Sequence, residues 1–222
     1  PQTTAELQTA VNLWISDNAT ALETYGGINT WDVSLITDMS QLFYNKTTFN
    51  DDISNWDVSS VTNMNMTFHH AQNFNGDISG WDVSNVIYMQ SIFFGASNFN
   101  QDVSGWDVSN VTDMGQIFKS CSSFNQDLSN WNTSSATKTF GMFAFAYEFN
   151  QDISNWDVSN VLDMNGMFHN ASSFNQNLSD WDVSNVTGME NMFYGNDALS
   201  EDNRCDIHYS FSEQTSAWPY DW

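Results

Sequence analysis

The feature that most constrains the fold is a repeat of 25 residues that runs through most of the chain without an insertion or deletion. Seven tryptophans mark the repeat: Trp31, Trp56, Trp81, Trp106, Trp131, Trp156 and Trp181. A strict period of this length is typical of proteins in which one unit cannot bury its apolar side chains alone, so that neighbouring units stack on a continuous core. We therefore expect one elongated domain of stacked coils.

Two apolar patterns alternate inside each repeat. Met164, Met167, Phe168 and Ala171 follow the i, i+3, i+4, i+7 spacing of one helix face. Around each tryptophan, Trp and Val alternate with polar residues, which indicates a short strand. The predicted fold class is an α/β repeat solenoid of about seven coils, each with one short parallel strand and one short helix or 3₁₀ turn.

Two kinds of residue recur in register and are predicted to be structural. The tryptophans are expected to stack in the core. The asparagine that follows the second phenylalanine of each repeat is expected to form a ladder whose amides bond turn backbone. Its members are Asn50, Asn75, Asn100, Asn125, Asn150 and Asn175.

The chain divides into three parts on this reading. Residues 1–27 predict a helical cap, because Thr3 and Glu6 have capping-box spacing before an amphipathic pattern. Residues 28–200 hold the seven repeats. Residues 201–222 predict a C-terminal cap with an aromatic tail, in which Asp206–Phe211 alternates like a last strand.

The unit Trp-Asp-Val-Ser-Asn-Val-Thr-Asp-Met, followed by Met-Phe, Ala and Phe-Asn-Gln-Asp-Ile-Ser, closely resembles the repeat of BspA-like leucine-rich-repeat surface proteins. The resemblance covers about residues 28–200. It implies a leucine-rich-repeat-like solenoid, display at the cell surface, and a role in adhesion or protein interaction. The family offers no catalytic residues to carry over.

Charge narrows the choice of partners. The chain carries 27 acidic and 4 basic residues, for a net charge of −23. This charge opposes nucleic acids and anionic membranes and permits cations, basic partners or neutral glycans. No apolar run approaches the roughly 20 residues of a membrane span, so membrane insertion is not expected. A start at Pro1 fits a form processed by a signal peptidase, hence an extracellular or cell-surface location.

Acidic residues recur in register and are the best candidates for metal binding. Calcium prefers oxygen ligands and could bridge the carboxylates of adjacent coils. The alternative is that these side chains bond turn amides and are screened by solvent. The candidate calcium ladder is Asp32, Asp57, Asp82, Asp107, Asp157 and Asp182.

Covalent modification is suggested by eight Asn-x-Ser/Thr sequons. They begin at Asn18, Asn45, Asn65, Asn110, Asn132, Asn170, Asn177 and Asn185. No disulfide is predicted, because the stacking of coils separates Cys121 from Cys205 by roughly 14–19 Å, beyond the reach of a disulfide.

Two regions break the pattern and are candidate partner-binding surfaces. The fifth repeat loses its usual Asp-Val and Met and gains aromatic residues, which indicates either neutral drift or a distinct surface. The aromatic tail either folds over the last coil or engages a neighbour. The candidate residues are Lys138, Phe140, Phe145, Tyr147, Trp218, Tyr220 and Trp222.

Catalysis is not predicted, since the four histidines are scattered and have no partners at metal or triad spacing. The predicted function is a non-enzymatic extracellular scaffold for adhesion or assembly, N-glycosylated and able to join head to tail into a filament. Its partners would be other proteins or further copies of itself. One alternative is a glycan-binding module, which requires aromatic residues on the surface. A second is a calcium-bridged component of an acidic surface layer.

Overall fold

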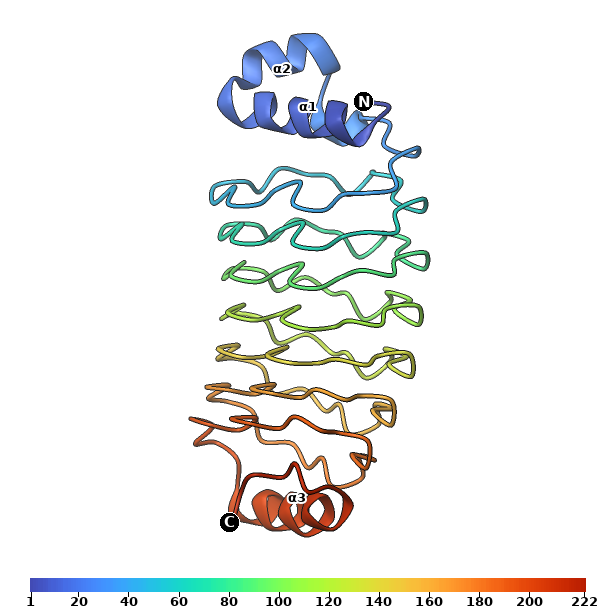
Figure 1. The fold of residues 1–222 in the computed structure, drawn as a ribbon. Helices are drawn as coiled ribbons and strands as arrows, with labels where there is room; N and C mark the ends of the chain where they lie inside the picture. The colour runs from blue at the N-terminus through green and yellow to red at the C-terminus, as the bar shows by residue number, and fades with distance from the viewer.

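The computed structural model describes residues 1–222 as a stack of coils between two helical ends. Figure 1 shows the coils in chain order, with α1 (Thr4–Ser16) and α2 (Asn18–Tyr25) at one end and α3 (Glu201–Gln214) at the other. A 3₁₀ turn, η1 (Ile28–Thr30), leads into the first coil. None of the three α-helices combines the length and the apolar character that a membrane span needs.

The predicted α/β solenoid is wrong, and so is the leucine-rich-repeat architecture, because the coils contain neither a strand nor an α-helix. The only β-type pairing is one row of isolated parallel bridges, a single residue per coil. The row consists of Asp38, Asn63, Tyr88, Asp113, Lys138, Asp163 and Gly188.

The backbone geometry of the predicted helical segment explains why no helix forms. In the first coil, the N–H groups of Gln41, Phe43 and Asn45 donate to carbonyls of the second coil at 2.8–3.0 Å. The N–H groups of Leu42 and Tyr44 donate instead to carbonyls three residues earlier. Gln41 and Asn45 have φ near +60°, which an α-helix does not tolerate. The i, i+3, i+4 spacing therefore identifies the buried side chains, although the backbone is not helical and its amides alternate between bonds to the next coil and bonds within the coil.

Around each tryptophan, tight turns replace the predicted strand. The N–H of Trp56 donates to Ile53 and that of Val61 to Val58, at 3.1 and 2.8 Å. Trp56 and Val58 are buried and the aspartate between them is exposed. The alternation of apolar and polar residues is therefore real, but the chain turns before a strand can pair.

The predicted tryptophan core is confirmed, since all seven repeat tryptophans are at most 4% exposed. From the second coil onward, each indole N–H donates to a carbonyl of the preceding segment, as Trp106 does to Ile78 at 3.1 Å. Phenylalanine rings stack beside them, with centroids of Phe68 and Phe93 5.6 Å apart. A single apolar core of 63 buried residues runs from α1 to α3.

The predicted asparagine ladder is also confirmed. The side-chain carbonyl of each rung accepts the backbone N–H of the rung in the next coil, as Asn100 does from Asn125 at 3.0 Å. The last rung, Asn175, accepts the N–H of Ser200 at 2.8 Å. The ladder therefore satisfies turn amides along one edge of the whole stack.

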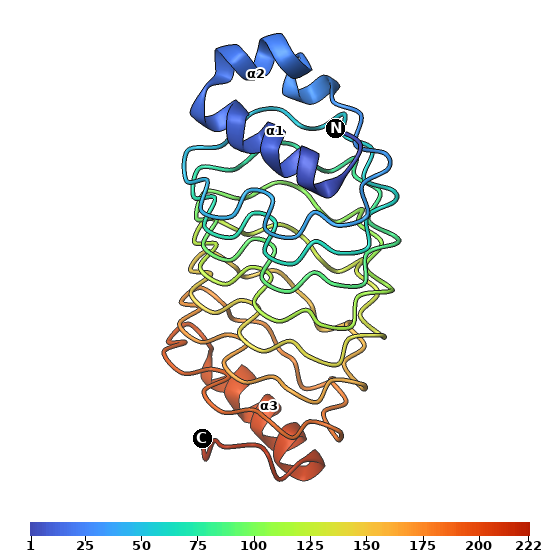
Figure 2. The ribbon, with the colours of Figure 1, turned by 45° about the horizontal axis from the view of Figure 1, so that its top comes forward.

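At the N-terminal end, α1 lies across the first coil (Figure 2). Its buried residues Leu7, Ala10 and Val11 join the core. The Thr4 hydroxyl and the Gln8 amide donate to carbonyls of the first coil at 2.9 and 3.1 Å. These carbonyls have no preceding coil to bond, so α1 satisfies them as well as covering the core.

At the C-terminal end, α3 replaces the predicted last strand, which is wrong. Ser200 caps the helix, and Ile207 and Phe211 are buried four residues apart on one face. Tyr209 is 71% exposed, so the burial follows helical spacing and not alternation. Polar residues on the outer face suit a helix that covers the end of a stack.

Candidate functional site

Because the repeat has no insertions, residues with the same offset from tryptophan lie in rows along the stack. The row thirteen residues after each tryptophan, here named the aromatic row, carries aromatic or basic side chains in six coils of seven. Its rings stack between coils: Tyr44 on His69 at 4.9 Å, His69 on Phe94 at 4.6 Å, and His169 on Tyr194 at 5.2 Å. The row consists of Tyr44, His69, Phe94, Lys119, Ala144, His169 and Tyr194.

A hollow of about 400 Å³ opens where the aromatic row is interrupted. It spans the fourth to the seventh coil, between Lys119 on one side and Glu190 on the other. Phe140 and Phe145 from the fifth coil and His169 from the sixth contribute its rings. We take this hollow, with the aromatic row that leads to it, as the candidate site.

The hollow exists because three side chains are missing at adjacent positions. Ala144 is the one small residue of the aromatic row. Gly141 and Gly166 lie ten residues after their tryptophans, where the flanking coils carry Gln116 and Asn191. All four of these last residues have φ between +57° and +61°, so the coil imposes a left-handed backbone there, and glycine adopts it without strain.

Aromatic side chains form the walls. The Phe140 ring lies against Gly115 of the preceding coil, in space that any side chain at Gly115 would occupy. Phe145 lies 5.1 Å from the His169 ring and 6.4 Å from Tyr147, measured between centroids. Both phenylalanines are partly exposed, so their rings line an open surface and not the core.

Polar groups complete the lining. Gln116 accepts a hydrogen bond from Ser91 through its side-chain oxygen, which leaves its NH₂ group free. The side-chain oxygen of Asn165 accepts the backbone N–H of Glu190 at 2.7 Å. The Lys119 ammonium lies 5.0 Å from the Phe94 centroid and forms no ion pair. Hydrogen-bond donors and acceptors, and side chains of both charges, therefore face the hollow.

His69 of the aromatic row is placed so that it stays neutral. The His69 ring lies between Tyr44 and Phe94, and its Nδ1 atom is buried without a hydrogen-bond partner. Desolvation, helped by the neighbouring His70, lowers the pKa of His69 to about 4. This ring therefore acts as a flat aromatic surface at neutral pH.

Of the candidate partner residues in the fifth repeat, Phe140 and Phe145 line the hollow and Tyr147 is exposed beside it. Lys138 lies in the bridge row and pairs with Asp113 at 3.3 Å, away from the hollow. Sequence reasoning missed the glycines, the alanine, Lys119 and His169. The signal was present as small residues at two fixed offsets, which comparing the repeats column by column would have found.

The aromatic tail folds back on the last coil. The rings of Trp218, Tyr220 and Trp222 lie 5.6–6.3 Å from Phe193. The Tyr220 hydroxyl accepts the Phe193 N–H at 2.7 Å, and the Trp218 indole donates to His208 at 3.0 Å. Trp222 is 39% exposed, which leaves one tail ring accessible.

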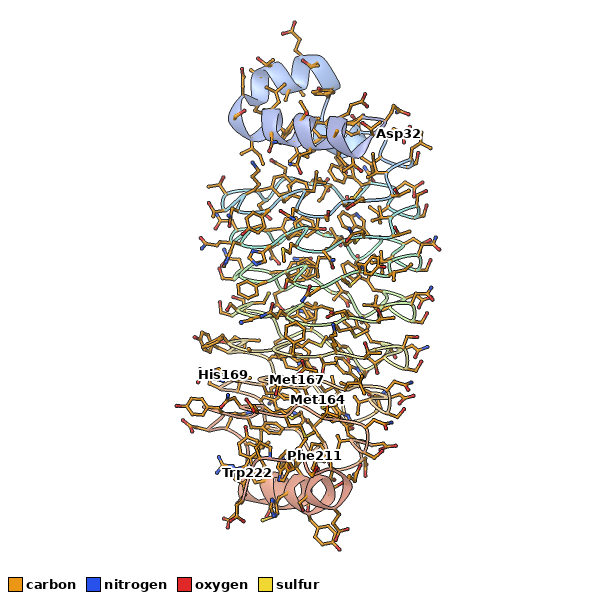
Figure 3. The ribbon with its side chains drawn as sticks, in the orientation of Figure 1. Asp32, Met164, Met167, His169, Phe211 and Trp222 are labelled. Carbon is orange, nitrogen blue, oxygen red and sulfur yellow. The ribbon has the colours of Figure 1, made fainter.

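The aspartates of the candidate calcium ladder serve turns. Each accepts the backbone N–H of the serine two residues later, as Asp57 does from Ser59 at 3.0 Å. The Ser59 hydroxyl, and then its N–H, lowers the pKa of Asp57. No three ligand residues in the chain are grouped so as to hold a metal ion. In the view of Figure 3, Asp32 and His169 lie at opposite sides of the stack.

The sequons differ in how free their side-chain amides are. Asn18, Asn45 and Asn132 are exposed, and their Nδ2 atoms have no partner in the chain. Nδ2 of Asn110 and of Asn185 donates to a serine carbonyl of the preceding coil at 2.8 Å. Nδ2 of Asn177 donates to an aspartate of α3 at 2.9 Å. Asn65 and Asn170 are half-buried.

Both cysteines are free thiols. Cys121 is buried, and its Sγ lies 2.9 Å from the carbonyl oxygen of Phe93. Burial raises the pKa of this thiol, so it behaves as a small core residue. Cys205 is exposed on α3.

Comparison with known proteins gives one family. Its model, described as Mycoplasma protein of unknown function, DUF285, matches residues 13–118 and again residues 98–205. No curated protein matches the chain. Because the two matches together span the coils and reach into both helical ends, the chain belongs to the DUF285 family.

Proposed function

We propose that the chain is a non-enzymatic scaffold, displayed outside the cell or at its surface, that adheres through the side bearing the aromatic row. The observation that carries this proposal is the row itself, which runs through the coils and is interrupted at Ala144 by a hollow lined by partly exposed rings. Exposed aromatic residues are enriched at binding surfaces, where they provide rigid contact area. Because backbone hydrogen bonds join each coil to the next, the aromatic row is held in place and can contact a partner without a change of the fold.

The acidic surface supports the same role. A net charge of −23 keeps such a scaffold soluble and free of nucleic acid. The exposed sequons at Asn18, Asn45 and Asn132 are open to a glycosylating enzyme if the chain passes through a secretory pathway.

The other functions expected from the sequence have less support. Head-to-tail stacking would require bare coil edges, whereas Thr4, Gln8 and Tyr220 already bond groups at the two edges. A calcium-bridged layer has less support, because one oxygen of each ladder aspartate already accepts turn hydrogen bonds and no three ligand residues are grouped so as to hold a metal ion.

Adhesion is tested by coating wells with the purified chain and counting the cultured epithelial cells that remain after washing. The proposal expects retention above that of albumin-coated wells. It also expects a loss in a row variant that carries serine at Tyr44, Phe94 and Tyr194. The matched control places serine at Leu35, Ile87 and Leu162, three exposed apolar residues of other rows. Retention equal to that on albumin, or equal losses in the two variants, would refute the proposal.

A further inference from the structure

The size and the lining of the hollow select a small polar ligand. A volume of about 400 Å³ lies at the lower end of the range for ligand sites, roughly 300–1,000 Å³. A buried site for an apolar molecule would be closed and lined mostly by hydrocarbon. This hollow is open, and its two phenylalanine rings stand among amides, an imidazole and charged groups.

The hydrogen-bonding groups point to hydroxyls. The lining offers donors in Lys119 and the free NH₂ of Gln116, and acceptors in the Glu190 carboxylate. The amides of Asn165 and Asn191 offer further polar atoms. A hydroxyl group can both donate and accept, so a polyhydroxylated molecule can use this mixture fully.

Charge disfavours the two ionic classes of ligand. A cationic side chain would meet the ammonium of Lys119 within the hollow, although the chain as a whole is acidic. An anion would meet Glu190 and the net charge of −23. The opposite charges of Lys119 and Glu190 offset each other locally, which suits a neutral molecule.

The placement of Phe145 is an independent sign of a binding role. It has φ of +60°, a conformation that is costly for a bulky side chain. The same offset carries Asn45, His70, Ser120 and Asn170 in four other coils and glycine in two more, all with positive φ, so the coil imposes this backbone in every repeat. The fold accounts for the conformation but not for a phenylalanine in it, and a partly exposed aromatic ring at this strained position fits a contact with a ligand.

We infer that the hollow is a subsite for a neutral sugar unit of a glycan. A sugar ring has apolar C–H faces and hydroxyl edges, which match aromatic rings flanked by polar groups. Phe145 and Phe140 contact the faces, and Gln116, Lys119 and Glu190 bond the hydroxyls. The inference rests on the proposed function, because it names the ligand class of the same surface.

The test measures binding of the full chain to immobilised dextran, mannan, galactan and a soluble β-glucan, with heparin and oligolysine as anionic and cationic comparisons. The inference expects binding to at least one neutral polysaccharide and weaker binding to heparin and oligolysine. Binding to heparin or oligolysine alone, or to none of the probes, would overturn it.

Two variants locate the site. Phe145→Asn removes the ring and installs the residue that other coils carry at that offset. The double variant Gly141→Gln, Gly166→Asn fills the hollow with new side chains. They are the residue types that Gln116 and Asn191 carry in the same row, with the same backbone conformation. Each is expected to weaken polysaccharide binding by about tenfold or more, since a stacked ring and its buried area account for a loss of that order.

Met66→Gln is the matched control, because it places the same side chain in the same row two or more coils away from the hollow. It is expected to bind like the wild type. Thermal unfolding of every variant identifies losses that are due to misfolding. Unchanged sugar binding in folded Phe145→Asn and in the filled variant would overturn the assignment of the hollow. Cell retention without sugar binding would leave the adhesion proposal standing, and sugar binding without cell retention would leave only the subsite.

Discussion

The asparagine ladder allows a graded test of what holds the coils together. The Asn125 side-chain oxygen accepts two hydrogen bonds at 2.9 Å, from the N–H of Asn150 and from the Gln151 amide. The Asn50 oxygen accepts only one, from the N–H of Asn75 at 2.8 Å. Replacement by alanine therefore removes two bonds at one rung and one at the other.

The second bond is missing at Asn50 because Gly76 stands where other coils carry glutamine. At about 0.5–1.5 kcal/mol for each bond, Asn125→Ala should lower the free energy of unfolding by about 1–3 kcal/mol. Asn50→Ala should lower it by about 0.5–1.5 kcal/mol. The two substitutions remove the same atoms, so the difference between their losses reports the second bond together with the greater burial of Asn125.

Urea unfolding followed by tryptophan fluorescence and by circular dichroism measures both losses. Coincidence of the two signals must be established first, because long stacks can unfold in parts. Equal losses at the two rungs, or a larger loss at Asn50, would refute the assignment of ladder stability to these side-chain bonds.

Three further outcomes are expected. Trp106→Phe removes the indole donor to the Ile78 carbonyl, which keeps its hydrogen bond from the Trp81 N–H, so urea unfolding should show a loss of about 0.5–1.5 kcal/mol for the missing bond; no loss would contradict the role of this bond. Tyr220→Phe removes the acceptor of the Phe193 N–H, so hydrogen exchange of that amide should accelerate while amides of the central coils stay unchanged. The pKa of His69 in the folded chain, about 4, lies below the ordinary value of 6.5, so the unfolded chain binds a proton first as pH falls. The melting temperature of His69→Phe minus that of the wild type should therefore increase as the pH is lowered from 6.5 to 4. A constant difference over that window would contradict a neutral His69 in the folded chain.

The rows and the core could be predicted because a constant period gives every coil the same offsets. Trp106 and Asn100 had to lie over their counterparts once coils stacked, whatever path the backbone took between them. The secondary structure could not be predicted in the same way. Met39, Leu42 and Phe43 have the burial of a helix face, yet alternate amides bond the next coil, and Gln41 and Asn45, four residues apart, adopt positive φ. Apolar spacing reports which side chains are buried and not which carbonyl each amide bonds.

The candidate site was only half visible in the sequence. Phe140 and Phe145 stood out as extra aromatic residues in the fifth repeat and lie in the walls. The space between them depends on Gly141, Gly166 and Ala144, which form no motif within one repeat and stand out only when the repeats are compared column by column. The tail was ambiguous for another reason, since Trp218 and Tyr220 suit a cap and an interface equally well until their hydrogen bonds to the last coil are known.

The hydrogen bonds between coils give one side of the stack a net dipole. In the segment that follows Met39, and in the corresponding segment of each later coil, the amides that bridge coils donate toward the C-terminal end. The carbonyls that they bond point toward the N-terminal end. Dipoles of neighbouring strands largely cancel in an ordinary sheet, whereas these add from coil to coil along one side. Oxygen atoms are therefore left at the first coil and N–H groups at the last. Thr4 and Gln8 meet the oxygen end as donors, and Tyr220 meets the N–H end as an acceptor, so the two caps have opposite polarity and cannot be exchanged.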